Sequence, residues 1–214
     1  MHFGKLILAA LVLSYSGTAF AQTWTSYASE EDRFAITFPG EPTVEETEWI
    51  DEDGNARPAR RYSARRGDDI YTLIAVDFSD AAFNLLRGSF AHAATVYRQM
   101  GRVTYDGFSQ VDRINGQQLQ ITLDSGRRLY FGAYLEGGIL YILDANVSAR
   151  SAPPGVFQQG LIVVDKDGVR VRYTQTGERI LRTDDLPEAL GGPDLDGPIL
   201  EGTSDEYINL DEEG

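Results

Sequence analysis

Cysteine and histidine, which enzymes often use as nucleophile or general base, are scarce in this sequence. The chain has no cysteine and only two histidines, His2 and His92. Ser89 and His92 are three residues apart on a predicted helix, which brings both side chains to one side of it. A catalytic pair also needs a cleft and an orienting carboxylate, so we interpret His92 as a structural or surface residue. Asp124-Ser125-Gly126 resembles a serine-protease phrase, but we interpret it as a turn between two strands.

A short acidic run imitates the start of a calcium-binding loop. In this run Asp51, Asp53 and Asn55 alternate around a glycine. A calcium loop of the EF-hand type also needs Gly at its sixth position and Glu at its twelfth. Those positions hold Ala56 and Tyr62. We therefore predict a solvated hairpin loop here, with a weak calcium site as the alternative, and we predict no cofactor.

The candidate binding residues are five arginines within ten positions: Arg57, Arg60, Arg61, Arg65 and Arg66. Guanidinium groups bind carboxylates and phosphates through paired hydrogen bonds. On a regular strand, alternation places Arg60 and Arg66 on one face and the other three on the opposite face. We therefore interpret this strand as a charged edge strand that discourages aggregation. The alternative is that the five arginines form an anion- or tail-binding strand.

Acidic residues are concentrated at the C-terminus. The formal charge is −14, and Thr183 to Gly214 contains eleven Asp or Glu residues and no Lys or Arg. Residues 22–182 hold 22 acidic and 18 basic residues, a net charge of −4. This distribution gives no electrostatic reason to expect nucleic-acid binding or docking on anionic lipid. Gly and Pro recur among the carboxylates, which predicts a disordered acidic tail over residues 183–214. Our working hypothesis is that this tail contacts the arginine strand and competes with an acidic partner.

The N-terminus has the pattern of a cleavable secretory signal. Lys5 precedes an apolar run from Leu6 to Leu13, and Ala19-Phe20-Ala21 forms a small-x-small cleavage site. We predict cleavage before Gln22, because the apolar run is much shorter than a membrane-spanning helix. With no cysteine to carry a lipid, the expected product is a soluble periplasmic or secreted protein, not a lipoprotein, without direct membrane insertion. Its expected parts are a signal peptide (1–21), a folded domain (22–182) and the acidic tail.

Apolar patterns in the first half of the domain predict strands and one helix. Phe34–Phe38 alternates and stops at Pro39-Gly40, which is typical of a half-buried strand ended by a turn. Val44–Ile50 and Arg57–Arg65 flank a loop of turn formers and predict a hairpin. Ile70–Phe78 is almost continuously apolar, which predicts a central strand. Apolar spacings of three and four then predict a helix that is capped by Ser79 or Asp80 and ends at Gly101.

The second half of the domain is predicted to be mostly β-structure. Turns at Asn115-Gly116 and Gly137-Gly138 separate four strands of a predicted antiparallel meander. These strands are Val103–Ile114, Gln117–Leu123, Arg127–Leu135 and Ile139–Asn146. Pro153-Pro154 then opens an apolar stretch to Val164, which is either a helix or a strand, with the prolines favouring a helix.

Several phrases in this order resemble the PsbP-like group of extrinsic lumenal photosystem II subunits and exported bacterial relatives. The phrases are Trp24-x-x-Tyr27, Arg33-Phe34-x-Ile36-x-Phe38-Pro39-Gly40-x-Pro42, Arg128-Leu129-Tyr130 and Leu140-Tyr141-Ile142-Leu143. The resemblance covers roughly residues 24–173. It implies an α+β fold in which helices flank both faces of a central antiparallel sheet, an α-β-α sandwich as in PsbP and the Ran-binding Mog protein. It transfers no functional residues, and members of this fold group are in general not enzymes.

Three classes of function remain open from the sequence. The favoured class is an exported, non-catalytic accessory or protein-binding module whose partner is another exported or membrane protein, or its own tail. The alternative is a carboxylate-dependent hydrolase, since Asp and Glu can do acid-base work without His or Cys. A third class is a carrier of a small ligand. A pocket with two buried carboxylates would favour the hydrolase, an exposed apolar patch would favour the module, and a closed apolar cavity under the helix would favour the carrier.

Overall fold

The computed structural model describes residues 24–180. The predicted signal peptide and acidic tail therefore lie outside the described residues. Ten strands and two helices occur within the described range. In chain order they are β1 (Thr25–Ser29), β2 (Phe34–Phe38), β3 (Thr43–Ile50), β4 (Ala56–Arg66), β5 (Asp69–Asp77), α1 (Phe83–Arg98), β6 (Gly101–Val111), β7 (Ile114–Leu123), β8 (Arg128–Glu136), β9 (Ile139–Val147), α2 (Gly155–Gln158) and β10 (Ile162–Val163).

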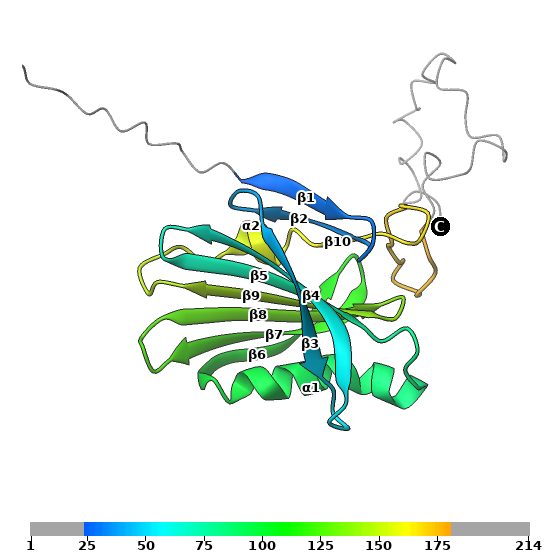
Figure 1. Ribbon diagram of the computed structural model, residues 1–214, viewed down its shortest axis with the longest axis horizontal. Helices are drawn as coiled ribbons and strands as arrows, with labels where there is room; N and C mark the ends of the chain where they lie inside the picture. The colour runs from blue at the N-terminus through cyan, green and yellow to red at the C-terminus, as the bar shows by residue number, and fades with distance from the viewer. Residues whose placement is uncertain (1–23, 181–214) are drawn as a thin grey trace, which may run out of the picture.

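The fold is dominated by antiparallel sheet. Seven strands form one large sheet in the order β3-β4-β5-β9-β8-β7-β6, and three form a small sheet in the order β1-β2-β10. In Figure 1 the small sheet lies above the large sheet and α1 lies below it. Among residues 24–180, no helix is long and apolar enough to cross a membrane.

Two apolar cores lie on opposite faces of the large sheet. One core joins the sheet to α1 through buried residues such as Leu85, Ala93 and Tyr97. The other joins the sheet to the small sheet and α2, with Phe34 and Phe157 among its buried residues. The apolar continuity of β5 follows from this arrangement, because the strand is covered on both faces.

The helix expected on the second face is replaced mainly by a sheet. That face is covered by β1, β2 and β10, together with the four-residue α2. The sequence left open whether the apolar stretch after Pro153-Pro154 is a helix or a strand. It contains both, since the short helix α2 is followed by the strand β10. β1 was not expected, because only Tyr27 among its residues is a large apolar side chain.

The first hairpin turn of the meander lies three residues before its predicted position, so that prediction is wrong. β6 and β7 meet at Asp112 and Arg113, which have φ of 50° and 68°, and Asn115-Gly116 lies inside β7. Arg170 pairs with Asp112 at 2.8 Å and stabilises this turn. Gly116 is required inside the strand because a Cβ there would lie 2.1 Å from the Ala133 carbonyl oxygen.

The helix cap is also different from the prediction. The residue that precedes α1 is Ala82 in an extended conformation, with no side-chain cap. Asp77 instead accepts a hydrogen bond from the Ser79 amide at 2.8 Å. Hydrogen bonds from the Ser79 side chain and amide lower the pKa of the Asp77 carboxyl. The turn after β5 therefore uses the residues that we had assigned to the helix cap.

Candidate functional site

The five candidate arginines lie on one regular strand, but the strand is not an edge strand. β4 pairs with β3 on one side and with β5 on the other. The expected alternation is present, because Tyr62 and Ala64 face the small-sheet core whereas Ala59 faces the α1 core. The edge-strand interpretation is therefore wrong, since the outer strand here is β3.

Arg60 binds carboxylates of its own domain. Its guanidinium donates to both oxygens of Asp32, at 2.8 and 2.6 Å, and pairs with Glu31 at 2.6 Å. The Tyr62 hydroxyl donates to the same Asp32 carboxylate, and the Tyr141 hydroxyl donates to the Asp32 carbonyl at 3.0 Å. Burial and the Asp32 hydrogen bond raise the pKa of the Tyr62 hydroxyl. These hydrogen bonds hold the turn between β1 and β2 against the large sheet.

The same network lines an open pocket of about 370 Å³. Glu31, Asp32, Arg33 and Arg60 line it together with Asp77. Both Asp32 oxygens already accept hydrogen bonds from protein donors, Arg60 and Tyr62.

The other candidate arginines have separate environments. Arg57 binds Asp51 at 2.9 Å and Asp80 at 2.6 Å. Arg61 lies opposite Glu45 on β3. Arg66 stacks over the Trp24 ring at 5.9 Å at the far end of the strand. Arg65 is exposed. The five arginines therefore make different contacts and do not form one patch.

The segment from Asp51 to Asn55, which resembles the start of a calcium-binding loop, forms a hairpin loop. One Asp51 oxygen accepts the amides of Asp53 and Asn55 at 3.0 and 2.8 Å, and the other accepts Arg57. These hydrogen bonds hold the pKa of Asp51 below its usual value despite burial, which acts in the opposite direction. No group of three metal-ligating side chains occurs among the residues that the structure describes. The Asp51 oxygens are directed at protein donors, as the hairpin interpretation requires.

The serine and histidine on the helix do not form a catalytic pair. The buried Ser89 donates to the Leu86 carbonyl at 2.9 Å. His92 instead contacts the Ile50 carbonyl at 3.1 Å and the edge of the Trp49 ring. His92 therefore joins α1 to the end of β3. Asp124-Ser125-Gly126 forms the expected turn, in which the Gly126 amide donates to the Leu123 carbonyl at 2.8 Å.

One carboxylate has a perturbed environment that the sequence did not indicate. Asp144 on β9 lies beneath the end of α1 and accepts a hydrogen bond from the buried Tyr97 hydroxyl at 3.1 Å. Burial raises the pKa of Asp144 to about 6, although Tyr97 and the nearby Arg61 act to lower it. A single aspartate within a strand carries no sequence pattern that predicts such burial.

The outer strand β6 presents exposed aromatic side chains beside an unpaired edge. Within the described residues β6 pairs with β7 alone, so its other edge has unpaired backbone groups. Tyr105 and Phe108 on this strand are 46% and 66% exposed, and the adjoining Met100 is 45% exposed. Exposed apolar side chains on an unpaired strand edge are typical of protein-binding surfaces.

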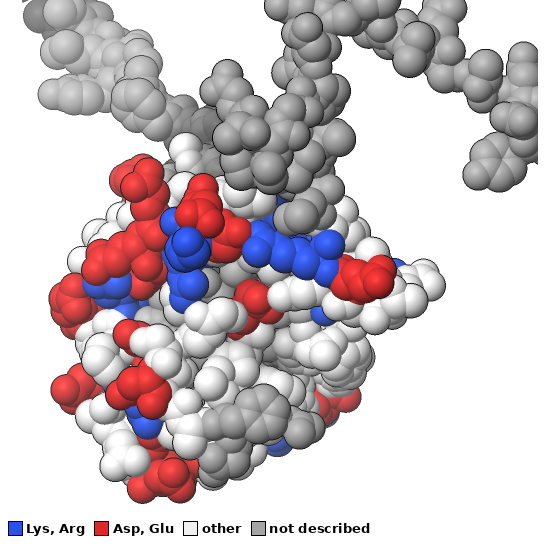
Figure 2. All heavy atoms as spheres, turned by 90° about the vertical axis from the view of Figure 1, so that its right-hand side faces the viewer, with Lys and Arg blue, Asp and Glu red and all other residues white. Residues whose placement is uncertain are grey.

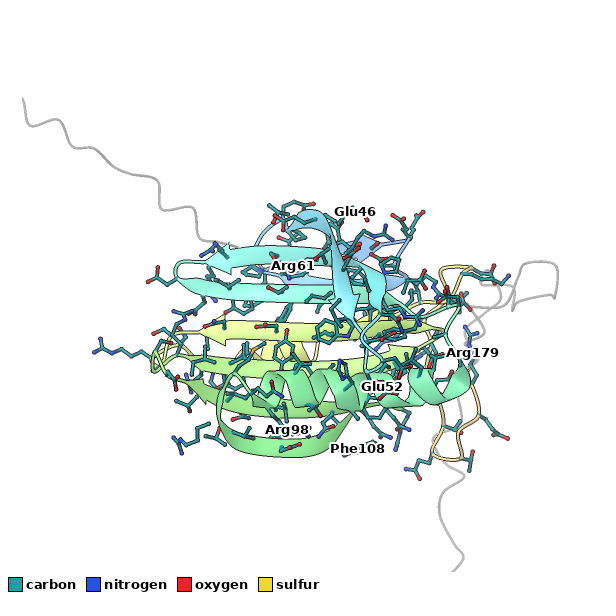
Figure 3. All side chains as sticks on the ribbon, turned by 60° about the horizontal axis from the view of Figure 1, so that its bottom comes forward. Glu46, Glu52, Arg61, Arg98, Phe108 and Arg179 are labelled. Atoms are coloured by element: carbon teal, nitrogen blue, oxygen red, sulfur yellow. The ribbon has the colours of Figure 1, made fainter. Side chains whose placement is uncertain are left out.

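A β-bulge places Val103 and Tyr105 of β6 on opposite faces of the sheet, although they are only two residues apart. The register shifts between Val103 and Tyr105, so Val103 faces the α1 core whereas Tyr105 faces the other side. Phe108 lies on the α1 face, opposite Gln117. In Figure 3, which brings the lower edge of Figure 1 forward, Phe108 and Arg98 are labelled along this edge below α1.

The polar residues beside Phe108 are held in place. Arg98, in the last turn of α1, donates to both oxygens of Asp106 at 2.8 and 3.2 Å, and Gln117 donates to one of them at 2.6 Å. The hydrogen bonds from Arg98 and Gln117 lower the pKa of the Asp106 carboxyl. We name the exposed strand edge formed by Met100, Tyr105, Asp106 and Phe108 the β6 edge. It combines an exposed aromatic side chain with a pre-organised ion pair, as protein-binding surfaces often do.

No protein-family model matches this chain, and no curated protein matches it significantly.

Proposed function

We propose that this chain is an exported, non-catalytic accessory module that binds another exported or membrane protein through the β6 edge. The observation that carries the proposal is the exposure of Tyr105 and Phe108 on an unpaired outer strand. An extended segment of a partner can add to such an edge through backbone hydrogen bonds, while side-chain contacts provide specificity.

The other outer strand is less suited to this role. Three glutamates, Glu45, Glu46 and Glu48, lie on β3, and two of them face Arg61 and Arg60 across the strand pair. Charged side chains along an edge strand discourage pairing with another chain. The β6 edge has one acidic residue, Asp106, and that carboxylate is already bound by Arg98.

Hydrogen bonding of two buried carboxylates, Asp32 and Asp51, supports a non-catalytic role for these two groups. Asp32 and Asp51 are 6% and 2% exposed, and both oxygens of each accept hydrogen bonds from the domain. A catalytic acid or base must instead exchange its proton with a substrate. The space between α1 and the sheet is filled by side chains such as Leu85, Ala94 and Tyr97, which disfavours a carrier of small ligands.

We also propose that the chain is exported and is related to the PsbP-like group. The apolar N-terminal run and its cleavage site support export. The Phe-x-x-x-Phe-Pro-Gly phrase forms β2 and the turn after it, where Gly40 has a φ of 101° that only glycine adopts readily. One long helix on one face of an antiparallel sheet agrees with half of the α-β-α arrangement that the resemblance implies.

The test compares two matched substitutions in the full chain. Phe108→Lys places a charge on the β6 edge, and Val44→Lys does the same on β3, where Val44 is 47% exposed. Tagged chains are expressed in the native source and recovered with their bound proteins. We expect a protein that co-purifies with the wild type and with Val44→Lys, and that is reduced more than about tenfold with Phe108→Lys. Equal recovery with both variants, or no co-purifying protein, would contradict the proposal.

A further inference from the structure

A second surface, at the opposite side of the domain from the β8–β9 turn, forms a pocket of about 500 Å³. Its walls come from the start of β1, the end of β4, the start of β5 and the segment that leads into α2. We name it the Trp24 pocket. It is lined by Trp24, Arg66, Asp69, Tyr71, Ser151, Ala152, Pro153, Pro154, Gly155 and Val156.

The apolar part of the Trp24 pocket is built from packed aromatic rings. The rings of Trp24 and Tyr71 meet edge to face with centroids 5.3 Å apart, and Tyr71 packs in turn on the fully buried Phe157 at 5.5 Å. Pro154 is buried beside them, whereas Val156 is 56% exposed. Aromatic and proline side chains that are fixed in this way bind aliphatic or proline residues with little loss of conformational entropy.

The charged part of the pocket favours an acidic ligand. The Asp69 carboxylate accepts the Ser148 amide at 2.7 Å and lies 3.8 Å from Arg127, so it has partners inside the domain. Arg66 is exposed and stacks on Trp24, and within residues 24–180 it forms no ion pair. A guanidinium that is stacked on an indole keeps its N–H groups directed outward for a carboxylate.

This end of the domain is basic, in contrast to the domain as a whole. The strand ends and loops around the pocket carry seven arginines and four acidic residues, a net charge of +3. They are residues 39–42, 65–69, 98–102, 124–128 and 148–154. Figure 2 shows the opposite end, where acidic side chains in red surround the basic ones in blue. The loops there hold thirteen acidic and seven basic residues, in the ranges 30–33, 51–57, 77–82, 112–113, 136–138 and 164–180.

We infer that the Trp24 pocket is a binding site for an acidic peptide segment with an aliphatic centre, and that residues 194–201 of the chain's own acidic tail occupy it. This segment reads Asp-Leu-Asp-Gly-Pro-Ile-Leu-Glu, with Pro198, Ile199 and Leu200 between carboxylates. The aliphatic residues suit the Trp24 and Pro154 wall, and the carboxylates suit Arg66 and its basic surroundings. The acidic end of the domain repels the same segment.

Chain length permits this contact. The last described residue, Ile180, lies at the acidic end, where its amide donates to the Arg172 carbonyl at 2.9 Å. The fifteen to twenty residues that follow can span roughly 50–65 Å when extended. The longest strands have eleven residues, which corresponds to about 35 Å. The chain after Ile180 is therefore long enough to reach the pocket across the length of the domain.

The test uses the full chain from Gln22 to Gly214 and the indole N–H signals of its two tryptophans, which nuclear magnetic resonance resolves. Trp24 lines the pocket and Trp49 lies on the α1 side of the sheet, so Trp49 is an internal control. We expect Ile199→Ser/Leu200→Ser to shift the Trp24 signal toward its high-salt position and to leave the Trp49 signal in place. The matched variant Ile208→Ser/Leu210→Ser, further along the tail, is expected to shift neither.

Two further variants assign the contact to Arg66. With Arg66→Gln, the Trp24 signal should no longer respond to the Ile199→Ser/Leu200→Ser change. With Arg102→Gln, which removes an exposed arginine of the same end, the response should persist. The inference is overturned if the Trp24 signal is the same with and without Ile199 and Leu200, or if both tail variants shift it equally.

A spin label gives an independent measure of position. Because the chain has no cysteine, Thr203→Cys provides a single attachment site for a nitroxide. We expect the label to broaden the Trp24 indole signal and not the Trp49 signal at low salt, and to lose this effect at high salt as screening weakens the contact. Equal broadening of both signals, or of neither, would overturn the inference.

Discussion

Replacing Asp144 with Asn should change how the stability of the domain depends on pH. The pKa of Asp144 is raised from 3.8 to about 6 by burial beneath α1. A carboxyl with a raised pKa in the folded state binds its proton more tightly there than in the unfolded chain. Its contribution to stability is therefore full below about pH 4 and is lost as the pH rises through 6.

The expected magnitude follows from the size of the shift. A difference of about two pKa units corresponds to roughly 3 kcal/mol, and the Tyr97 hydroxyl can still donate to the asparagine carbonyl. Relative to the wild type, we expect Asp144→Asn to have nearly the same free energy of unfolding at pH 4 and to be about 1–3 kcal/mol more stable at pH 8. Urea unfolding, followed by circular dichroism at several pH values, measures this difference.

A matched control separates this effect from that of the other carboxylates. Asp124 is exposed in the β7–β8 turn, so the stability difference between Asp124→Asn and the wild type should stay constant from pH 4 to 8. For Asp144→Asn, a constant difference or a loss of stability at pH 8 would refute the explanation that burial of the charge is costly.

Three further substitutions test the packing and the hydrogen bonds. Gly116→Ala should destabilise the domain by more than about 2 kcal/mol in thermal unfolding, because its Cβ would overlap the Ala133 carbonyl oxygen; a neutral result would contradict the close packing of β7 on β8. Tyr62→Phe removes a donor to the Asp32 carboxylate and should cost about 1–2 kcal/mol in urea unfolding, whereas no change would show that this hydrogen bond is unimportant. Phe157→Ala leaves a cavity in the small-sheet core and should cost about 3–5 kcal/mol by the same measurement, with less than about 1 kcal/mol as the contrary result.

Local patterns predicted the elements whose structure depends mainly on neighbouring residues. The hairpin of β3 and β4, the buried strand β5 and the helix α1 are confirmed, because their periodicity reflects the faces that they bury. The Gly137-Gly138 turn is also confirmed, with φ of 54° and 81°. The Asn115-Gly116 prediction is wrong because packing on Ala133 fixes Gly116 inside β7 and leaves Asp112 and Arg113 to form the turn.

The candidate site could be predicted only in part. The alternation of the arginines on β4 was correct, but their carboxylate partners, such as Asp32, come from distant parts of the chain. The β6 edge depends on strand order, which no local pattern specifies. The bulge after Val103 also interrupts the regular alternation of faces along β6. Period-two counting from Val103 therefore assigns Tyr105 to the wrong face of the sheet.

The most direct test of the proposed function is site-specific photo-crosslinking in the native source. A photoreactive phenylalanine analogue is placed at position 108 on the β6 edge, or at position 44 on β3 as the control, and both side chains are exposed in the structure. We predict one discrete crosslinked product at position 108 that is absent at position 44. The same product at both positions, or no product at position 108, would contradict a binding role for the β6 edge.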